Sequence, residues 1–208
     1  MRAALGLLEK LTLTPDEVNP EDIAELRAAR ITAQSITDAV YICAGFNIIN
    51  RIADALSFKV PPTDVFVRGA KILLRFGYKM MSGVWFEGKA SQYTYPEESK
   101  STMGREALDD PYQSKFKRLK ETVLSGPGAL DPAVRKAASQ GEAIPGVLGA
   151  YVKKVATRAY MVTDEDVAAL CEAGYTEDQI FEATVSAAMG AGLVRVQLGI
   201  GALRAGEI

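Results

Sequence analysis

Histidine is absent from this chain, and cysteine occurs only twice, at Cys43 and Cys171. The lack of histidine removes the commonest general base, the commonest metal ligand and every catalytic relay that depends on an imidazole. Two isolated cysteines cannot complete a zinc, haem or thiol-peroxidase centre of the ordinary type. We therefore expect no metal and no cofactor in this protein.

A surplus of basic charge is also missing. The chain has 24 basic and 26 acidic residues in mixed order, for a net charge of -2. Such a chain has no positive field to attract nucleic acid or an anionic membrane, so neither is an expected partner. The most apolar long stretch, 184–203, is interrupted by Arg195 and Gln197, which favours a buried helix over a membrane span.

The sequence gives no indication of export. The segment "MRAALGLLEKLT" resembles a helix more than a signal peptide, because Glu9 interrupts its short apolar stretch and no convincing cleavage site follows. Two cysteines far apart in the sequence are no disulfide framework, which points to a reducing compartment. We expect a cytoplasmic protein.

Helix signals dominate the chain, which predicts an all-α fold. At 208 residues and 48% hydrophobic composition, the chain can form one large domain or two small, closely packed ones, and we assign a single domain, 1–208. Strand-like alternation is scarce, and "DVFVRG" at 64–69 is its best candidate. Capping residues precede the expected helices at Asn19, Asp110, Asp131, Thr163 and Thr176. Expected left-handed C-terminal caps are Gly126, Gly141 and Gly174.

One long segment breaks the helical pattern. Residues 82–110 contain few aliphatic residues but four aromatic ones, Trp85, Phe86, Tyr93 and Tyr95. A loop of this length is unusual inside a compact domain and is often functional or interfacial. The simpler interpretation is an irregular connector whose aromatic side chains anchor it to the core.

The chain contains an internal repeat. Segment 21–52 aligns with 165–196 without a gap, and ten of the 32 positions are identical. Each copy predicts a short helix, a turn and a long helix, so we assign repeat one to about 1–60 and repeat two to about 145–208. Gly190 and Gly192 would let the long helices approach closely, which predicts pairing of the copies around a pseudo-twofold axis.

The repeated unit resembles a known family. The segments "ARITAQSITDAVYICAGFNIINRIADAL" and "AGYTEDQIFEATVSAAMGAGLVRV" are similar to the helical hairpin of the carboxymuconolactone decarboxylase and alkyl hydroperoxidase D superfamily. The segments "KLTLTPDEVNPEDIAELR" and "FNIINRIADAL" are more similar to its peroxidase-related branch. This resemblance implies a helical bundle with two pseudo-equivalent hairpins and a homo-oligomer, either a dimer or a small ring.

The resemblance does not extend to the family's redox chemistry. Redox members carry C-x-x-C with a nearby histidine and an upstream glutamate on the helix before the hairpin, where one cysteine attacks the peroxide and the other resolves the disulfide. The corresponding segment here, "PGVLGAYVKKVATRAYMV", has neither residue, so no catalytic residue can be assigned. Cys43 and Cys171 are interpreted as structural. An in-frame C-x-x-C and histidine encoded upstream of Met1 would restore an antioxidant peroxidase.

A polar stripe interrupts the first long helix. Its members are spaced i, i+3, i+4 and i+7, at Asn47, Asn50, Arg51 and Asp54. Arg51 recurs as Arg195 in the second copy, whereas the asparagines do not recur. One interpretation pairs the arginine with a carboxylate, Asp54 or Glu182. The other is a pocket for a small anionic ligand, lined by Asn47, Asn50, Arg51 and Arg195, in which arginine clamps a carboxylate.

Three functional hypotheses follow. The first is a divergent member of the superfamily that lacks the cysteine pair and is not an active two-cysteine peroxidase as encoded. The second is a cysteine-independent decarboxylase or isomerase acting on a small anionic substrate. The third is a non-catalytic structural subunit of a larger oligomer.

Overall fold

A computed structural model describes residues 2–59, 62–76 and 110–206. The regular elements within these ranges are all helices, so the predicted all-α class is confirmed. The aromatic segment predicted at 82–110 lies outside the described residues except for Asp110. The chain divides into two compact units, Met1–Phe58 with Leu108–Ile208, and Lys59–Ala107.

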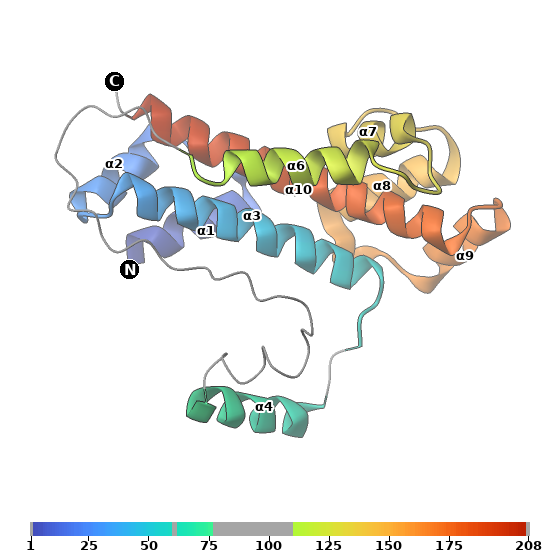
Figure 1. The fold of residues 1–208 in the computed structure, drawn as a ribbon, viewed down its shortest axis with the longest axis horizontal. Helices are drawn as coiled ribbons and strands as arrows, with labels where there is room; N and C mark the ends of the chain where they lie inside the picture. The colour runs from blue at the N-terminus through green and yellow to red at the C-terminus, as the bar shows by residue number, and fades with distance from the viewer. Residues whose placement is uncertain (1, 60–61, 77–109, 207–208) are drawn as a thin grey trace. The chain divides into compact units, whose positions relative to one another are not determined.

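The larger unit consists of helices packed around one antiparallel pair (Figure 1). The long helices of that pair are α3 (Ala33–Ala55) and α10 (Glu177–Ala205). The elements before α3 are α1 (Arg2–Leu13), η1 (Pro15–Glu17) and α2 (Pro20–Ala28). Those between α3 and α10 are α6 (Gln113–Ser125), α7 (Pro132–Gln140), α8 (Gly146–Arg158), η3 (Ala159–Met161) and α9 (Asp164–Glu172).

The smaller unit contains α4 (Thr63–Phe76), which includes the segment considered as a strand. That segment is helical because its charged residues follow a helical period. They lie at Asp64, Arg68, Lys71 and Arg75, on one side of the helix, and Arg68 donates a hydrogen bond to Asp64 one turn earlier.

Most helix starts follow the predicted caps. The Asn19 side chain accepts the backbone N–H of Asp22, and the Asp22 carboxylate accepts the N–H of Asn19. Thr176 forms the same reciprocal arrangement with Gln179. At Thr163 the Asp166 carboxylate accepts both the N–H and the hydroxyl of the capping residue. Asp110 accepts the N–H groups of both Tyr112 and Gln113, so α6 begins at Gln113, slightly later than the sequence predicts.

The predicted glycine caps are correct at two of three positions. Gly141 and Gly174 have positive φ angles of 70° and 90°, the left-handed region that favours glycine. Gly126 is instead extended, with a φ of -68° and a ψ of 171°. The prediction for Gly126 is therefore wrong; the chain leaves α6 extended, and the Gly126 carbonyl accepts a hydrogen bond from buried Arg135 at 2.5 Å.

Glycines in α10 bring two different helices close to it. A Cβ at Gly192 would lie 2.5 Å from Cγ1 of Ile48, so this glycine permits the close approach of α3. A Cβ at Gly190 would lie 1.9 Å from the carbonyl oxygen of Ser139, which belongs to α7. The expectation that both glycines pair the two long helices therefore holds for Gly192 only.

The two segments 2–55 and 146–199 have matching element starts. Each start in the second segment lies 144 residues after its counterpart in the first: Arg2 and Gly146, Pro15 and Ala159, Pro20 and Asp164, Ala33 and Glu177. The match includes an ion pair, because Lys10 contacts Asp22 at 2.9 Å and Lys154 contacts Asp166 at 2.5 Å. The correspondence thus extends beyond the aligned hairpins to a preceding helix and a short 3₁₀ turn.

The long helix α10 is the main element of the core. Its residues contribute to both clusters of buried apolar side chains, one with α8 and α9 and one with α1, α2 and α3. Among the described residues, α10 alone is long and apolar enough to cross a membrane by length and composition, and 56% of its most apolar window is buried within the protein.

Candidate functional site

A cleft of about 710 Å³ in the larger unit contains all four residues predicted as ligand-binding: Asn47, Asn50, Arg51 and Arg195. Its walls come from α1, α3, the end of α8 with η3, and one residue of α10. The cleft is within the volume range of small-molecule sites. The polar stripe of α3 therefore faces a hollow rather than packed side chains.

Arg51 is held by main-chain and amide oxygens. Its Nε donates to the carbonyl oxygen of Ala156 at 3.1 Å, and its Nη1 donates to the carbonyl and side-chain oxygens of Asn47 at 3.0 and 2.8 Å. No carboxylate among the described residues lies within ion-pair distance of this guanidinium. The Nη2 atom has no protein partner in the described ranges, so it is the part of Arg51 that remains available to a ligand.

Arg195 makes the corresponding contacts from the other long helix. Its Nη1 donates to the carbonyl oxygen of Ala191, one turn earlier, at 2.7 Å, and its Nη2 donates to that of Thr12 at 3.0 Å. Thr12 precedes Ala156 by 144 residues, so each arginine reaches the equivalent carbonyl of the opposite segment. Arg195 is 6% exposed, and its buried Nε has no hydrogen-bond partner.

The predicted pairing of the arginine with Glu182 is wrong. Glu182 accepts the backbone N–H groups of Ala129 and Leu130 at 2.8 and 2.9 Å, and it lies 3.8 Å from buried Arg135. These contacts fix the turn between α6 and α7 onto α10. The alternative partner, Asp54, lines the cleft and acts on Arg51 only through its charge.

The two asparagines have different roles in the geometry. Asn47 is 5% exposed; its Nδ2 donates to the carbonyl oxygen of Cys43 at 3.0 Å while its oxygen accepts from Arg51. Asn47 therefore orients the guanidinium of Arg51. The exposed side chain of Asn50 has no partner among the described residues, so its amide is free to meet a ligand at the cleft.

Two desolvated positive charges share this cleft. Burial lowers the pKa of Arg51 to about 10, the charge of Arg195 acts in the same direction, and Asp54 opposes both. Burial also lowers the pKa of Arg195, against the opposing effects of Cys43 and Asp16. Arg51 remains protonated at neutral pH, so the cleft holds two positive charges. A bound anion would reduce the repulsion between them.

The two cysteines are separate and free. Cys43 is buried in α3, where its Sγ lies 3.5 Å from both Oγ1 of Thr12 and Nδ2 of Asn47. Cys171 is exposed on α9. No group of three or more histidine, cysteine, aspartate or glutamate residues in the described ranges is placed to hold a metal ion.

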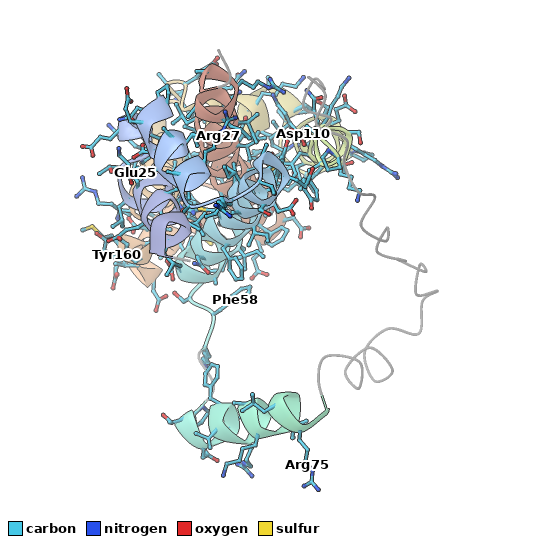
Figure 2. The ribbon with its side chains drawn as sticks, turned by 90° about the vertical axis from the view of Figure 1, so that its left-hand side faces the viewer. Glu25, Arg27, Phe58, Arg75, Asp110 and Tyr160 are labelled. Carbon is cyan, nitrogen blue, oxygen red and sulfur yellow. The ribbon has the colours of Figure 1, made fainter. Side chains whose placement is uncertain are left out.

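Several lining residues were missed by the sequence interpretation, including three with polar side chains that come from outside the two long helices. Thr12 comes from α1, Arg158 is the last residue of α8, and Tyr160 lies in η3. Tyr160 is 73% exposed at the surface of the larger unit (Figure 2). The repeat was the one feature of the sequence that could have pointed to them, because its register makes Thr12 equivalent to Ala156. That register does not show that the two repeat segments meet at one cleft.

No protein-family model, curated protein sequence or solved structure matches this chain. The functional argument therefore rests on the geometry of the cleft.

Proposed function

We propose that this protein is a divergent, all-α relative of the carboxymuconolactone decarboxylase and alkyl hydroperoxidase D superfamily that binds a small anionic ligand in the cleft. It does not carry out a two-cysteine peroxidase cycle. The observation that carries the proposal is the arginine pair. A half-buried guanidinium, that of Arg51, and a buried one, that of Arg195, line one cleft, and no described carboxylate is within ion-pair distance of either.

The two-copy arrangement supports the family relationship. Matching element starts, matching lysine–aspartate pairs and the reciprocal donation of Arg51 and Arg195 all follow a shift of 144 residues. Random helical packing gives no reason for such agreement at several independent positions. We infer from this agreement that the hairpins, the preceding helices and the arginines are two copies of one unit, related by a pseudo-twofold axis.

The cleft also favours a ligand site over a purely structural subunit. A structural role predicts a closed, packed bundle around Arg51, whereas Arg51, Asn50 and Arg158 line open space. A buried charge without an ion partner is costly, and its retention is explained if an anion binds there. Asp54 is the only carboxylate among the lining residues, so the lining carries an excess of positive charge.

Binding can be tested with simple anions. Acetate and phosphate are titrated into the protein and followed by NMR chemical shifts of the arginine side chains and α3 amides. Arg51→Gln is expected to weaken binding about 10- to 100-fold, because a hydrogen bond to a charged group contributes about 1.5–3 kcal/mol. Lys153→Gln is the matched control: Lys153 is an exposed charge on α8 that does not line the cleft, so this substitution is expected to change affinity by only a few fold.

Equal effects of these two substitutions would show that binding is a general charge effect and would contradict the proposed site. Circular dichroism of each variant establishes that the fold is retained.

The absence of the peroxidase cycle has its own assay. Wild type and the double variant Cys43→Ser, Cys171→Ser are compared for peroxide consumption with a dithiol reductant. We expect no turnover above background in either, because one thiol is buried, the other is exposed on a different helix, and no histidine assists. Turnover in the wild type that disappears in the variant would refute this expectation.

A further inference from the structure

The donors available in the cleft match an anionic group with two oxygens. Nη2 of Arg51 and the amide of Asn50 have no protein partner among the described residues, and both residues line the cleft. The other nitrogens of Arg51 are already committed to protein oxygens, so its bidentate edge is not available. Two separate donors suit a carboxylate, which accepts through two oxygens.

A second observation points to an anion at this place. Arg195 lines the same cleft and is 6% exposed, and its Nε has no hydrogen-bond partner. Arg158, the last residue of α8, adds a further positive charge to the lining. One negative charge held at Arg51 would reduce the repulsion between Arg51 and Arg195 without the cost of burying a dianion near Asp54.

The adjoining wall of the cleft is apolar and exposed. It includes Leu13, Ile42 and Phe46, which are 70%, 58% and 62% exposed. The α10 residues 144 positions after Ile42 and Phe46 are Ser186 and Gly190, which are small and buried. Thus α3 carries large apolar side chains at positions where α10 carries small, buried ones. The large side chains of Ile42 and Phe46 line the same cleft as Arg51 and Asn50.

We propose that the ligand of this cleft is an amphiphilic monocarboxylate. Its carboxylate accepts hydrogen bonds from Arg51 and Asn50, and its aliphatic tail covers Ile42 and Phe46. This inference rests on the proposed function and narrows it to one class of ligand. A volume of about 710 Å³ leaves space for a tail beyond the carboxylate.

The test is a chain-length series. Acetate, hexanoate and decanoate, all below their micellar concentrations, are titrated into the full-length protein by calorimetry. Affinity is expected to rise with length, by up to about fourfold for each methylene that becomes fully buried. Asn50→Asp should weaken all three ligands at least tenfold by placing a carboxylate beside theirs, and because Asn50 is exposed the fold should be unaffected.

Phe46→Ser separates the tail from the carboxylate. We expect it to leave acetate affinity unchanged and to flatten the increase from acetate to decanoate. Ile49→Ser is the matched control: Ile49 is 61% exposed on the same helix but does not line the cleft, so its substitution should preserve the chain-length dependence.

Four results would overturn the inference. Binding of acetate without dependence on chain length would leave the proposed function intact but remove the amphiphilic ligand. Failure of every anion to bind would reject both. If Phe46→Ser dissociates an oligomer in sedimentation without altering decanoate affinity, the wall is an interface between copies. If vesicles containing phosphatidylglycerol capture the protein and decanoate does not compete, the surface binds a membrane.

Discussion

Substitution Gly190→Ala gives the sharpest test of the packing in the larger unit. A methyl group at this position would lie 1.9 Å from the carbonyl oxygen of Ser139 and 2.6 Å from its carbonyl carbon. Both atoms are main-chain atoms within α7, so a side-chain rotation cannot relieve the collision. The helices must separate, or α7 must shift.

The expected magnitude is the balance of two effects. Overpacking a well-packed site costs about 1–3 kcal/mol. Replacing a mid-helix glycine by alanine gains about 1 kcal/mol from helix propensity. Since the contact with Ser139 involves backbone, we expect the upper part of the overpacking range and a net loss of about 2 kcal/mol.

Gly201→Ala is the matched control on the same helix. No atom lies within 4 Å of a Cβ built at Gly201, so the propensity effect acts alone and should stabilise the protein by about 0.5–1 kcal/mol. Free energies of unfolding are measured by urea denaturation, followed by circular dichroism at 222 nm. Two alanine variants of equal stability would show that α7 does not approach α10 as closely as the structure indicates.

Two further predictions concern pH and assembly. Burial raises the pKa of Glu182, but the N–H groups of Leu130 and Ala129 and the charge of Arg135 outweigh it and lower the pKa below the usual value of 4.5. The stabilising contribution of Glu182 is therefore present above pH 4.5 and is lost as the pH falls through the lower folded-state pKa. In urea titrations the wild type should lose more stability than Glu182→Gln between about pH 5 and pH 3. If the two proteins lose stability in parallel as the pH falls, Glu182 does not have this role. Assembly is expected to be a dimer or small ring, and a monomer in sedimentation at micromolar concentration would contradict it.

The all-α class and most helix starts could be predicted from the sequence because their causes are local. A cap such as Asn19 acts on a backbone N–H three residues away, and the charged residues of α4 lie within neighbouring turns. Gly141 is likewise recognised from its own position after the helical pattern. These interactions need no knowledge of the rest of the chain.

Part of the candidate site was also readable from one helix. The spacing of Asn47, Asn50 and Arg51 places them along one side of α3, and the repeat adds Arg195 at the equivalent position of α10. Helical spacing defines a face, but it does not say whether that face meets solvent, another helix or a hollow.

Tertiary packing decided the partners of these residues. The carbonyl oxygen that accepts the hydrogen bond from Nε of Arg51 belongs to Ala156, 105 residues away. The carboxylate of Glu182 accepts the backbone N–H groups of Ala129 and Leu130, more than 50 residues before it. Such contacts depend on how helices distant in sequence approach one another. The sequence alone thus determined the helices and the side of α3 that carries the polar groups, while the packing of α1, η3 and α10 around that side created the cleft.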